Sequence, residues 1–108
     1  MKVEMWEIMV PTTSNEGNPF RTRYHKVWDE KVRSIAGGLT ILKPAKGQWV
    51  NVDSKLYAER MIPVRIACTR QQIDKIIDIT LKYYNQEAVL AIKISEEVIL
   101  KYKDEKII

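Results

Sequence analysis

Two amphipathic helical patterns, interleaved with short apolar segments typical of strands, restrict the fold of this 108-residue sequence more than any other feature. The clearer helical pattern covers residues 69–84. It starts at Thr69, which forms a capping box with Gln72, and apolar residues then recur at helical spacing. This segment is therefore predicted to be an amphipathic helix packed on a core.

The other helical pattern begins after a loop rich in hydroxyl and amide side chains. Asn18 is the expected N-cap, Pro19 the expected first helical residue, and the pair Gly37-Gly38 the expected end. Apolar residues recur between these limits every three to five positions, with most of the basic side chains outside the stripe. We therefore predict a first helix over residues 19–36.

The apolar segments between and around the helices are predicted strands. Pro63 cannot donate to a ladder, so it implies a bulge or an outward-facing position. The turn formers at residues 44–47 suggest a hairpin between the second and third of these segments. The predicted strands are 3–10, 39–42, 48–50, 61–66, 88–94 and 98–100.

This order predicts one domain over residues 1–108, of the α+β class and ferredoxin-like. Two helices would cover one face of a mainly antiparallel sheet, which gains an extra C-terminal strand, and the charged tail 101–108 is expected to fray. Several strands are apolar on both sides, while two helices cover only one face. We therefore expect the other face to meet a second copy, in a homodimer or a higher homo-oligomer.

Composition excludes several kinds of protein. No apolar run approaches the roughly 18 residues of a membrane span, and the first residues do not resemble a signal peptide, so a cytoplasmic protein without membrane contact is expected. Cys68 is the only cysteine and His25 the only histidine, which excludes an internal disulfide and a Cys/His metal cluster within one chain. We expect no metal and no cofactor.

The net charge of +4 is concentrated in the middle of the chain. Residues 20–65 contain ten basic and four acidic residues, whereas residues 66–108 contain seven of each. A concentrated positive field attracts anions such as phosphates or acidic protein surfaces. The alternative is a basic surface that serves only solubility.

Several short motifs resemble a group of small uncharacterised proteins from bacteria and phages. The resemblance rests on Gly-Gly-Leu-Thr at 37–40, Gly-Gln-Trp at 47–49 and Gln-Glu-Ala-Val at 86–89, and extends over roughly residues 6–99. It implies a ferredoxin-like fold and, if the source is a phage, a role in counter-defence. It implies no activity and no catalytic residue.

The strongest candidate ligand surface combines a polar loop with the start of the first helix. Helix N-termini favour anions, and arginine adds bidentate hydrogen bonds to phosphate or carboxylate. A solvated loop beside a solvated helix start is the alternative. The residues proposed for this surface are Thr12, Thr13, Asn15, Arg21, Arg23 and His25.

A second candidate group surrounds the predicted hairpin. A stacking platform with cationic neighbours for a nucleobase could be formed by Lys43, Lys46, Trp49 and Tyr57. Strand alternation, however, favours a buried position for Trp49. Arg65 is a further candidate ligand residue, although pairing among Glu59, Arg60 and Arg65 is favoured over ligand contact.

These observations lead to three hypotheses of function. The first is a non-enzymatic binding protein that captures or sequesters a small anionic ligand, either a nucleotide or a phosphorylated metabolite. The second is a protein-interaction module or inhibitor that docks on a larger host protein. The third is a cofactor-free enzyme that uses His25 as its acid-base group, with Glu59, Glu16 or Asp29 as the carboxylate that orients it. Specific nucleic-acid binding is disfavoured because the segment 61–66 lacks exposed aromatic residues.

Overall fold

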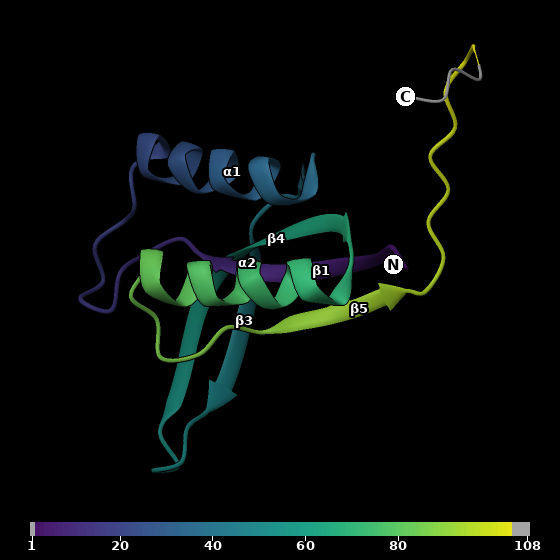
Figure 1. Cartoon of the computed structure of the whole chain (residues 1–108). Coiled ribbons are helices and arrows are strands. Elements are labelled where there is room, and N and C mark those ends of the chain that lie inside the picture. The colour runs from purple at the N-terminus through teal and green to yellow at the C-terminus, as the bar shows by residue number, and fades with distance from the viewer. Residues whose placement is uncertain (1, 105–108) are drawn as a thin grey trace.

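The computed structural model describes residues 2–104, in which two helices pack on one face of a five-stranded sheet (Figure 1). Every strand pairing is antiparallel, the strand order is β2-β4-β1-β5, and β3 also pairs with β4. This arrangement confirms the predicted ferredoxin-like α+β class. The elements are β1 (Glu4–Pro11), α1 (Thr22–Ala36), β2 (Thr40–Ile41), β3 (Ala45–Val50), β4 (Leu56–Cys68), α2 (Arg70–Tyr83) and β5 (Ala91–Ser95).

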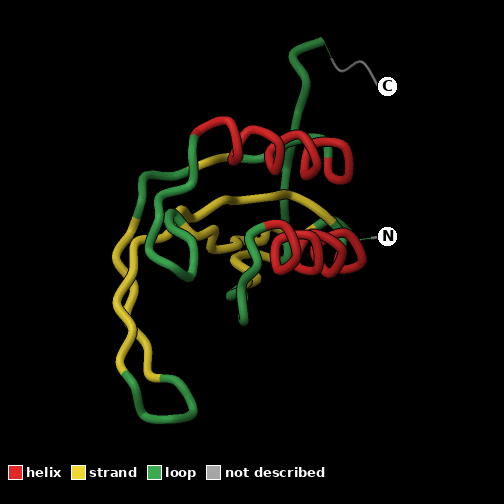
Figure 2. The backbone as a smooth tube through the Cα atoms, turned by 90° about the vertical axis from the view of Figure 1, so that its left-hand side faces the viewer, coloured by secondary structure: helices red, strands yellow, loops and turns green. Residues whose placement is uncertain are grey.

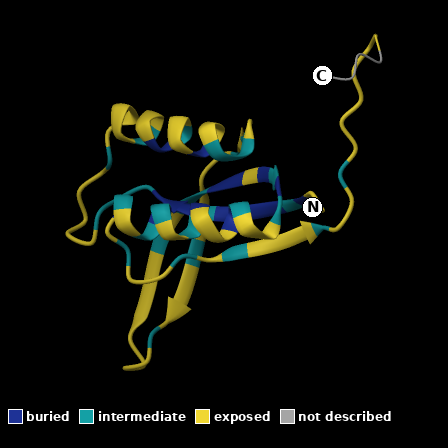
Figure 3. Ribbon diagram, in the orientation of Figure 1, coloured by how far each residue is buried: buried dark blue, intermediate teal, exposed yellow. Residues whose placement is uncertain are grey.

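The core lies between the two helices and the middle of the sheet. β1 is central, with β4 on one side and β5 on the other, so its apolar residues are covered along most of its length. Figure 3 shows that buried residues concentrate on β1 and the adjoining part of β4. The residues of this core are Trp6, Ile8, Val10, Trp28, Val32, Val64, Ile66, Cys68, Ile73, Ile76 and Tyr84.

The two helix starts differ in how well local sequence predicted them. α2 begins as expected: the Thr69 hydroxyl accepts from the Gln72 amide N–H at 3.2 Å, and the Gln72 side chain accepts from the Thr69 N–H at 2.9 Å. The predicted start of α1 at Pro19 was wrong. The chain remains extended to the N-cap Arg21, because Thr13 bridges to Pro19 and the following residue, Phe20, donates its backbone N–H to the Thr12 carbonyl.

Replacing Thr69 with alanine is expected to lower the free energy of unfolding by about 1 kcal/mol, because an N-terminal amide of α2 loses its hydrogen-bond acceptor. Urea denaturation measures this change. Ser34→Ala is the matched control, since the Ser34 hydroxyl only donates to the Lys31 carbonyl on the exposed side of α1. Equal effects of the two substitutions would contradict the capping role.

The predicted hairpin between residues 39–42 and 48–50 was wrong. β2 and β3 do not pair with each other; they lie one after the other along the same edge of β4, and the hairpin is formed by β3 and β4. Figure 2 shows this hairpin projecting away from the helices. Pro63 lies on β4 opposite the gap between β2 and β3, where its carbonyl accepts from the Leu42 N–H. The N–H and C=O of one residue point to the same side of an antiparallel strand. The N–H that proline lacks would therefore point into this gap, where no strand needs it.

The chain leaves the sheet after β5 (Figure 1). Residues 98–100 form no strand, so the predicted extra C-terminal strand was wrong. The tail expected to fray falls partly on residues 105–108, which lie outside the described part of the chain. Within residues 2–104, neither helix has the length and apolar character needed to cross a membrane.

Candidate functional site

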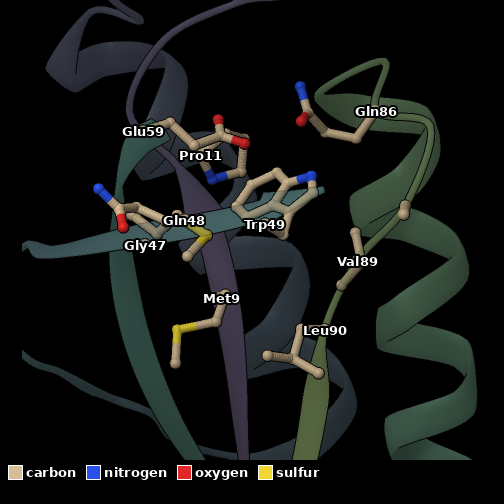
Figure 4. A pocket seen from close by; sticks show the side chains of 11 residues that line it. Met9, Pro11, Gly47, Gln48, Trp49, Glu59, Gln86, Val89 and Leu90 are labelled. Atoms are coloured by element: carbon tan, nitrogen blue, oxygen red, sulfur yellow. The ribbon is translucent and has the colours of Figure 1, made fainter. Parts of the chain in front are cut away.

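A cavity of about 490 Å³ opens where the β3–β4 hairpin bends away from the body of the protein (Figure 4). We call it the sheet pocket. Its volume is within the range of small-molecule sites in proteins. It is lined by Met9, Pro11, Gly47, Gln48, Trp49, Glu59, Met61, Gln86, Ala88, Val89 and Leu90.

The sheet pocket is built by strand pairing rather than by neighbours in sequence. Pro11 of β1 lies opposite Met61 of β4, and Gly47 of β3 lies opposite Glu59 of β4. The segment after α2 closes the remaining side, where the Leu90 carbonyl accepts from the backbone N–H of a β1 residue at 3.0 Å. Four separate parts of the chain therefore meet in this one cavity.

Gly47 makes room for one wall of the sheet pocket. A Cβ atom at this position would overlap with the terminal methyl of Met61. The absence of a side chain leaves this space to the flexible end of Met61. The glycine in the Gly-Gln-Trp motif therefore shapes the pocket.

Trp49 is 41% exposed and lines the sheet pocket. The prediction that it is buried in the core was wrong. Strand alternation assigns a residue to a face of the sheet, but β3 lies on the projecting hairpin, where no helix covers either face (Figures 1 and 3). The indole is instead available to stack on a planar ligand.

Glu59 is the one ionisable residue among the eleven that line the sheet pocket. Its carboxylate forms no ion pair or side-chain hydrogen bond with any other residue in the described range 2–104. Burial raises the pKa of this carboxyl group above its ordinary value. An unpaired carboxylate among apolar walls favours a ligand that brings positive charge or hydroxyl donors.

Of the residues proposed from sequence, only Trp49 lines the sheet pocket. The polar loop instead holds the fold together: the Thr12 hydroxyl donates to the Arg60 carbonyl at 2.9 Å, and the Asn15 amide donates to the Asn85 carbonyl at 2.8 Å. Thr13 takes part in the bridge to Pro19. These groups connect β1 to β4 and to the end of α2.

Arg21 and Arg23 do come together, in a second and more open cavity of about 350 Å³. We call this the arginine pocket; it is lined by Pro19, Phe20, Arg21, Arg23, Tyr24, Val27 and Tyr83. Tyr24 and Tyr83 stack with their ring centroids 4.2 Å apart. Neither arginine forms an ion pair with another residue of the described chain.

His25 does not line the arginine pocket, although its ring packs edge-on against Phe20, which does. Its Nδ1 is 2.7 Å from the hydroxyl of Tyr84, whose side chain is buried. Burial lowers the pKa of His25, and the nearby Asp29 carboxylate partly opposes this effect. Of the carboxylates considered as partners for His25, Asp29 is the one that affects its pKa.

The remaining basic candidates are dispersed. Arg65 pairs with Glu7 at 3.1 Å, so the expected pairing with Glu59 was wrong. Lys46 lies on β3 three residues from Trp49, on the opposite face of the strand. Lys43 is exposed in the link between β2 and β3.

The described residues offer no metal site, since no three histidine, cysteine, aspartate or glutamate side chains gather between residues 2 and 104. Cys68 is buried at the end of β4. Burial, together with the nearby Glu4 carboxylate, raises the pKa of its thiol to about 11. The thiol therefore stays protonated at neutral pH and is a weak nucleophile.

Sequence reasoning missed most of the sheet pocket. Met9 and Met61 read as ordinary strand residues, and Glu59 as one half of an ion pair. Two signals were available, because Gly47-Gln48-Trp49 and the segment 86–89 both stand out as motifs. Neither motif shows by itself that the two segments face each other across a cavity.

The sequence matches no protein-family model and no curated protein. Solved structures do resemble the fold. A phage SAM lyase in complex with S-methyl-5′-thioadenosine superposes with a TM-score of 0.65 at 11% identity, over 83% of this chain and 78% of that one. The divalent cation tolerance protein CutA1 from Thermus thermophilus gives 0.62 at 11% identity, over 89% and 87%. The periplasmic divalent cation tolerance protein CutA from Archaeoglobus fulgidus gives 0.60 at 12%, over 89% and 87%. At these identities the likenesses establish the ferredoxin-like fold alone.

Proposed function

We propose that the sheet pocket binds a nucleoside that carries a 5′ thioether or sulfonium group, the class of S-methyl-5′-thioadenosine and S-adenosylmethionine. The observation that carries the proposal is the combination of a half-exposed indole, apolar walls and one unpaired carboxylate in a single cavity. Trp49 offers a stacking surface for the base. Met9, Met61 and Leu90 offer contacts for an apolar sulfur substituent.

Glu59 supports a cationic or neutral ligand in this pocket rather than an anionic one. A sulfonium would compensate its carboxylate, and ribose hydroxyls would donate hydrogen bonds to it. No lysine or arginine lines the pocket to neutralise a phosphate. The structural likeness to a SAM lyase that holds S-methyl-5′-thioadenosine agrees with this ligand class.

We propose sequestration as the activity: the protein removes its ligand from solution without changing it. In a phage, such removal would serve counter-defence. Cleavage is the second candidate, favoured by the lyase among the structural neighbours. With S-adenosylmethionine as the substrate, cleavage would break the bond between the sulfur and the γ-carbon of the amino-acid chain, with the electron pair passing to sulfur. The substrate's own carboxylate oxygen would bond to that carbon, releasing a lactone and S-methyl-5′-thioadenosine.

A second copy of the chain is the proposed cover for the open sheet face. Leu90 lines the sheet pocket and is exposed, and Ile92 and Ile94 continue this exposed apolar surface along β5. Exposed apolar surface of this kind is typical of subunit interfaces. A homo-oligomer would therefore cover the face that the two helices leave open.

Native mass spectrometry with added S-methyl-5′-thioadenosine or S-adenosylmethionine tests binding and subunit number together. We expect an oligomer that retains one nucleoside per chain. Conversion of S-adenosylmethionine to S-methyl-5′-thioadenosine, followed by chromatography, would favour cleavage over sequestration. Absence of both binding and conversion would overturn the proposed function.

The arginine pocket provides the internal comparison for ligand charge. Two arginines without ion pairs beside stacked tyrosines favour an anionic ligand there, as the sequence predicts. The double variant Arg21→Ala, Arg23→Ala should leave binding of S-methyl-5′-thioadenosine unchanged. Loss of that binding would place the nucleoside in the arginine pocket and remove the sheet pocket from consideration.

A further inference from the structure

The side-chain amide of Gln86 has a defined orientation in the sheet pocket. Its nitrogen Nε2 is 3.1 Å from the backbone carbonyl oxygen of Tyr84. A carbonyl oxygen only accepts hydrogen bonds, so the NH₂ group must occupy this side of the amide. In Figure 4 the amide oxygen lies on the side nearer Trp49. Oε1 has no hydrogen-bond partner within residues 2–104 and remains an open acceptor.

The backbone that carries Gln86 is held by the end of α2. Asn85 adopts the left-handed conformation with φ of 52°, which asparagine tolerates better than most residues. The Gln86 N–H donates to the Leu81 carbonyl at 3.0 Å, and the Asn85 N–H donates to the Lys82 carbonyl at 3.3 Å. These two bonds form a Schellman motif, which fixes where the chain leaves the helix.

Two side chains hold this helix end from outside α2. Asn15 donates to the carbonyl of Asn85 at 2.8 Å, and His25 makes the 2.7 Å hydrogen bond to the buried Tyr84 hydroxyl. Both were proposed from sequence as ligand residues. In the structure Asn15 binds the backbone next to Gln86, and His25 binds the side chain of Tyr84 at the same helix end.

We infer that Gln86 selects the base of the ligand: its open acceptor favours a purine with a 6-amino group over one with a 6-oxo group. The inference rests on the proposed nucleoside function and specifies its base. Stacking on Trp49 tolerates any base, so discrimination must come from a hydrogen bond to the base edge. Adenine presents its 6-amino donor at the base edge that glutamine side chains recognise in DNA. Hypoxanthine presents a 6-oxo oxygen at the same position. This oxygen would face Oε1 with no proton between the two acceptors.

The experiment compares S-methyl-5′-thioadenosine and S-methyl-5′-thioinosine by isothermal titration calorimetry. The two compounds differ at the 6-substituent and at the adjacent N1, which carries a proton only in the inosine compound. The unmodified protein is expected to bind the adenosine compound about tenfold more tightly, the equivalent of one hydrogen bond. Gln86→Leu should reduce this ratio to about one, mainly by weakening the adenosine compound. Gln48→Leu is the matched control, because Gln48 lines the same pocket and should leave the ratio unchanged.

Each outcome separates this inference from the proposed function. Binding of neither nucleoside by the unmodified protein overturns the proposed function. Equal binding of both overturns the role of Gln86 while the proposed function stands. Loss of discrimination in Gln48→Leu but not in Gln86→Leu would assign base selection to Gln48, which also overturns the inference. If Gln86→Leu does not fold, the affinity ratio of the two nucleosides for Gln86→Met and for the unmodified protein still tests the role of Gln86.

Discussion

Replacing Trp49 with alanine is expected to weaken binding of S-methyl-5′-thioadenosine by about 1–3 kcal/mol, roughly tenfold to a hundredfold. The indole is the only aromatic side chain among the eleven lining residues, so no other ring can stack on the base. Thermal stability should change little, because the side chain is half exposed on the projecting hairpin. Isothermal titration calorimetry measures the affinity, and differential scanning calorimetry the stability.

Tyr57→Ala is the matched control for Trp49→Ala. Tyr57 lies directly opposite Trp49 in the β3–β4 ladder and is similarly exposed, at 40%, but it does not line the sheet pocket. Its removal should affect the affinity much less. Equal losses of affinity in the two variants would show that the hairpin acts only through its shape, which would contradict stacking on Trp49.

Replacing Glu59 with glutamine is expected to separate cationic from neutral ligands. Affinity for S-adenosylmethionine should fall by about tenfold to a hundredfold, since a charge-assisted contact is lost, while affinity for the uncharged S-methyl-5′-thioadenosine should change by about twofold or less. Titration calorimetry with both compounds measures the difference. Equal losses for both would show that Glu59 binds the shared nucleoside rather than the sulfonium.

The pKa of Glu59 sets the sign of the pH dependence. Because burial raises this pKa, the ionised carboxylate lowers folding stability at neutral pH, and this cost disappears as the pH falls from the raised pKa toward the ordinary value. Affinity for S-adenosylmethionine should decline over the same interval. Glu59→Gln should remove that decline and should be at least as stable as the unmodified protein at neutral pH.

Local sequence signals predicted the element types well. The capping box at Thr69 placed the start of α2 within one residue, and Gly37 ended α1 in the left-handed conformation that glycine favours. Both signals act through backbone groups a few residues away, so they are readable from sequence alone. Asn18-Pro19 resembled an equally good start signal, but a bridge between Thr13 and Pro19 kept the chain extended.

Charge was the least reliable guide to the site. The excess of positive charge in residues 20–65 suggested one anion-binding surface. In the folded protein Arg21 and Arg23 line the arginine pocket, Arg65 pairs with Glu7, and His25 binds the Tyr84 hydroxyl. Sequence position does not determine which side of a sheet or helix a cation occupies relative to distant residues. The sheet pocket, in contrast, contains no basic side chain.

The sequence by itself determined the type and order of the two helices and most strands and that they assemble into a two-layer α+β domain, because periodicity and caps are properties of neighbouring residues. Only the tertiary structure decided where a ligand can bind. Met9, Trp49, Glu59 and Gln86 are separated by up to 77 positions, and they meet because β1, β3 and β4 pair in one register and the end of α2 returns beside them. The exposure of Trp49 was decided in the same way, by how far the helices extend over the sheet.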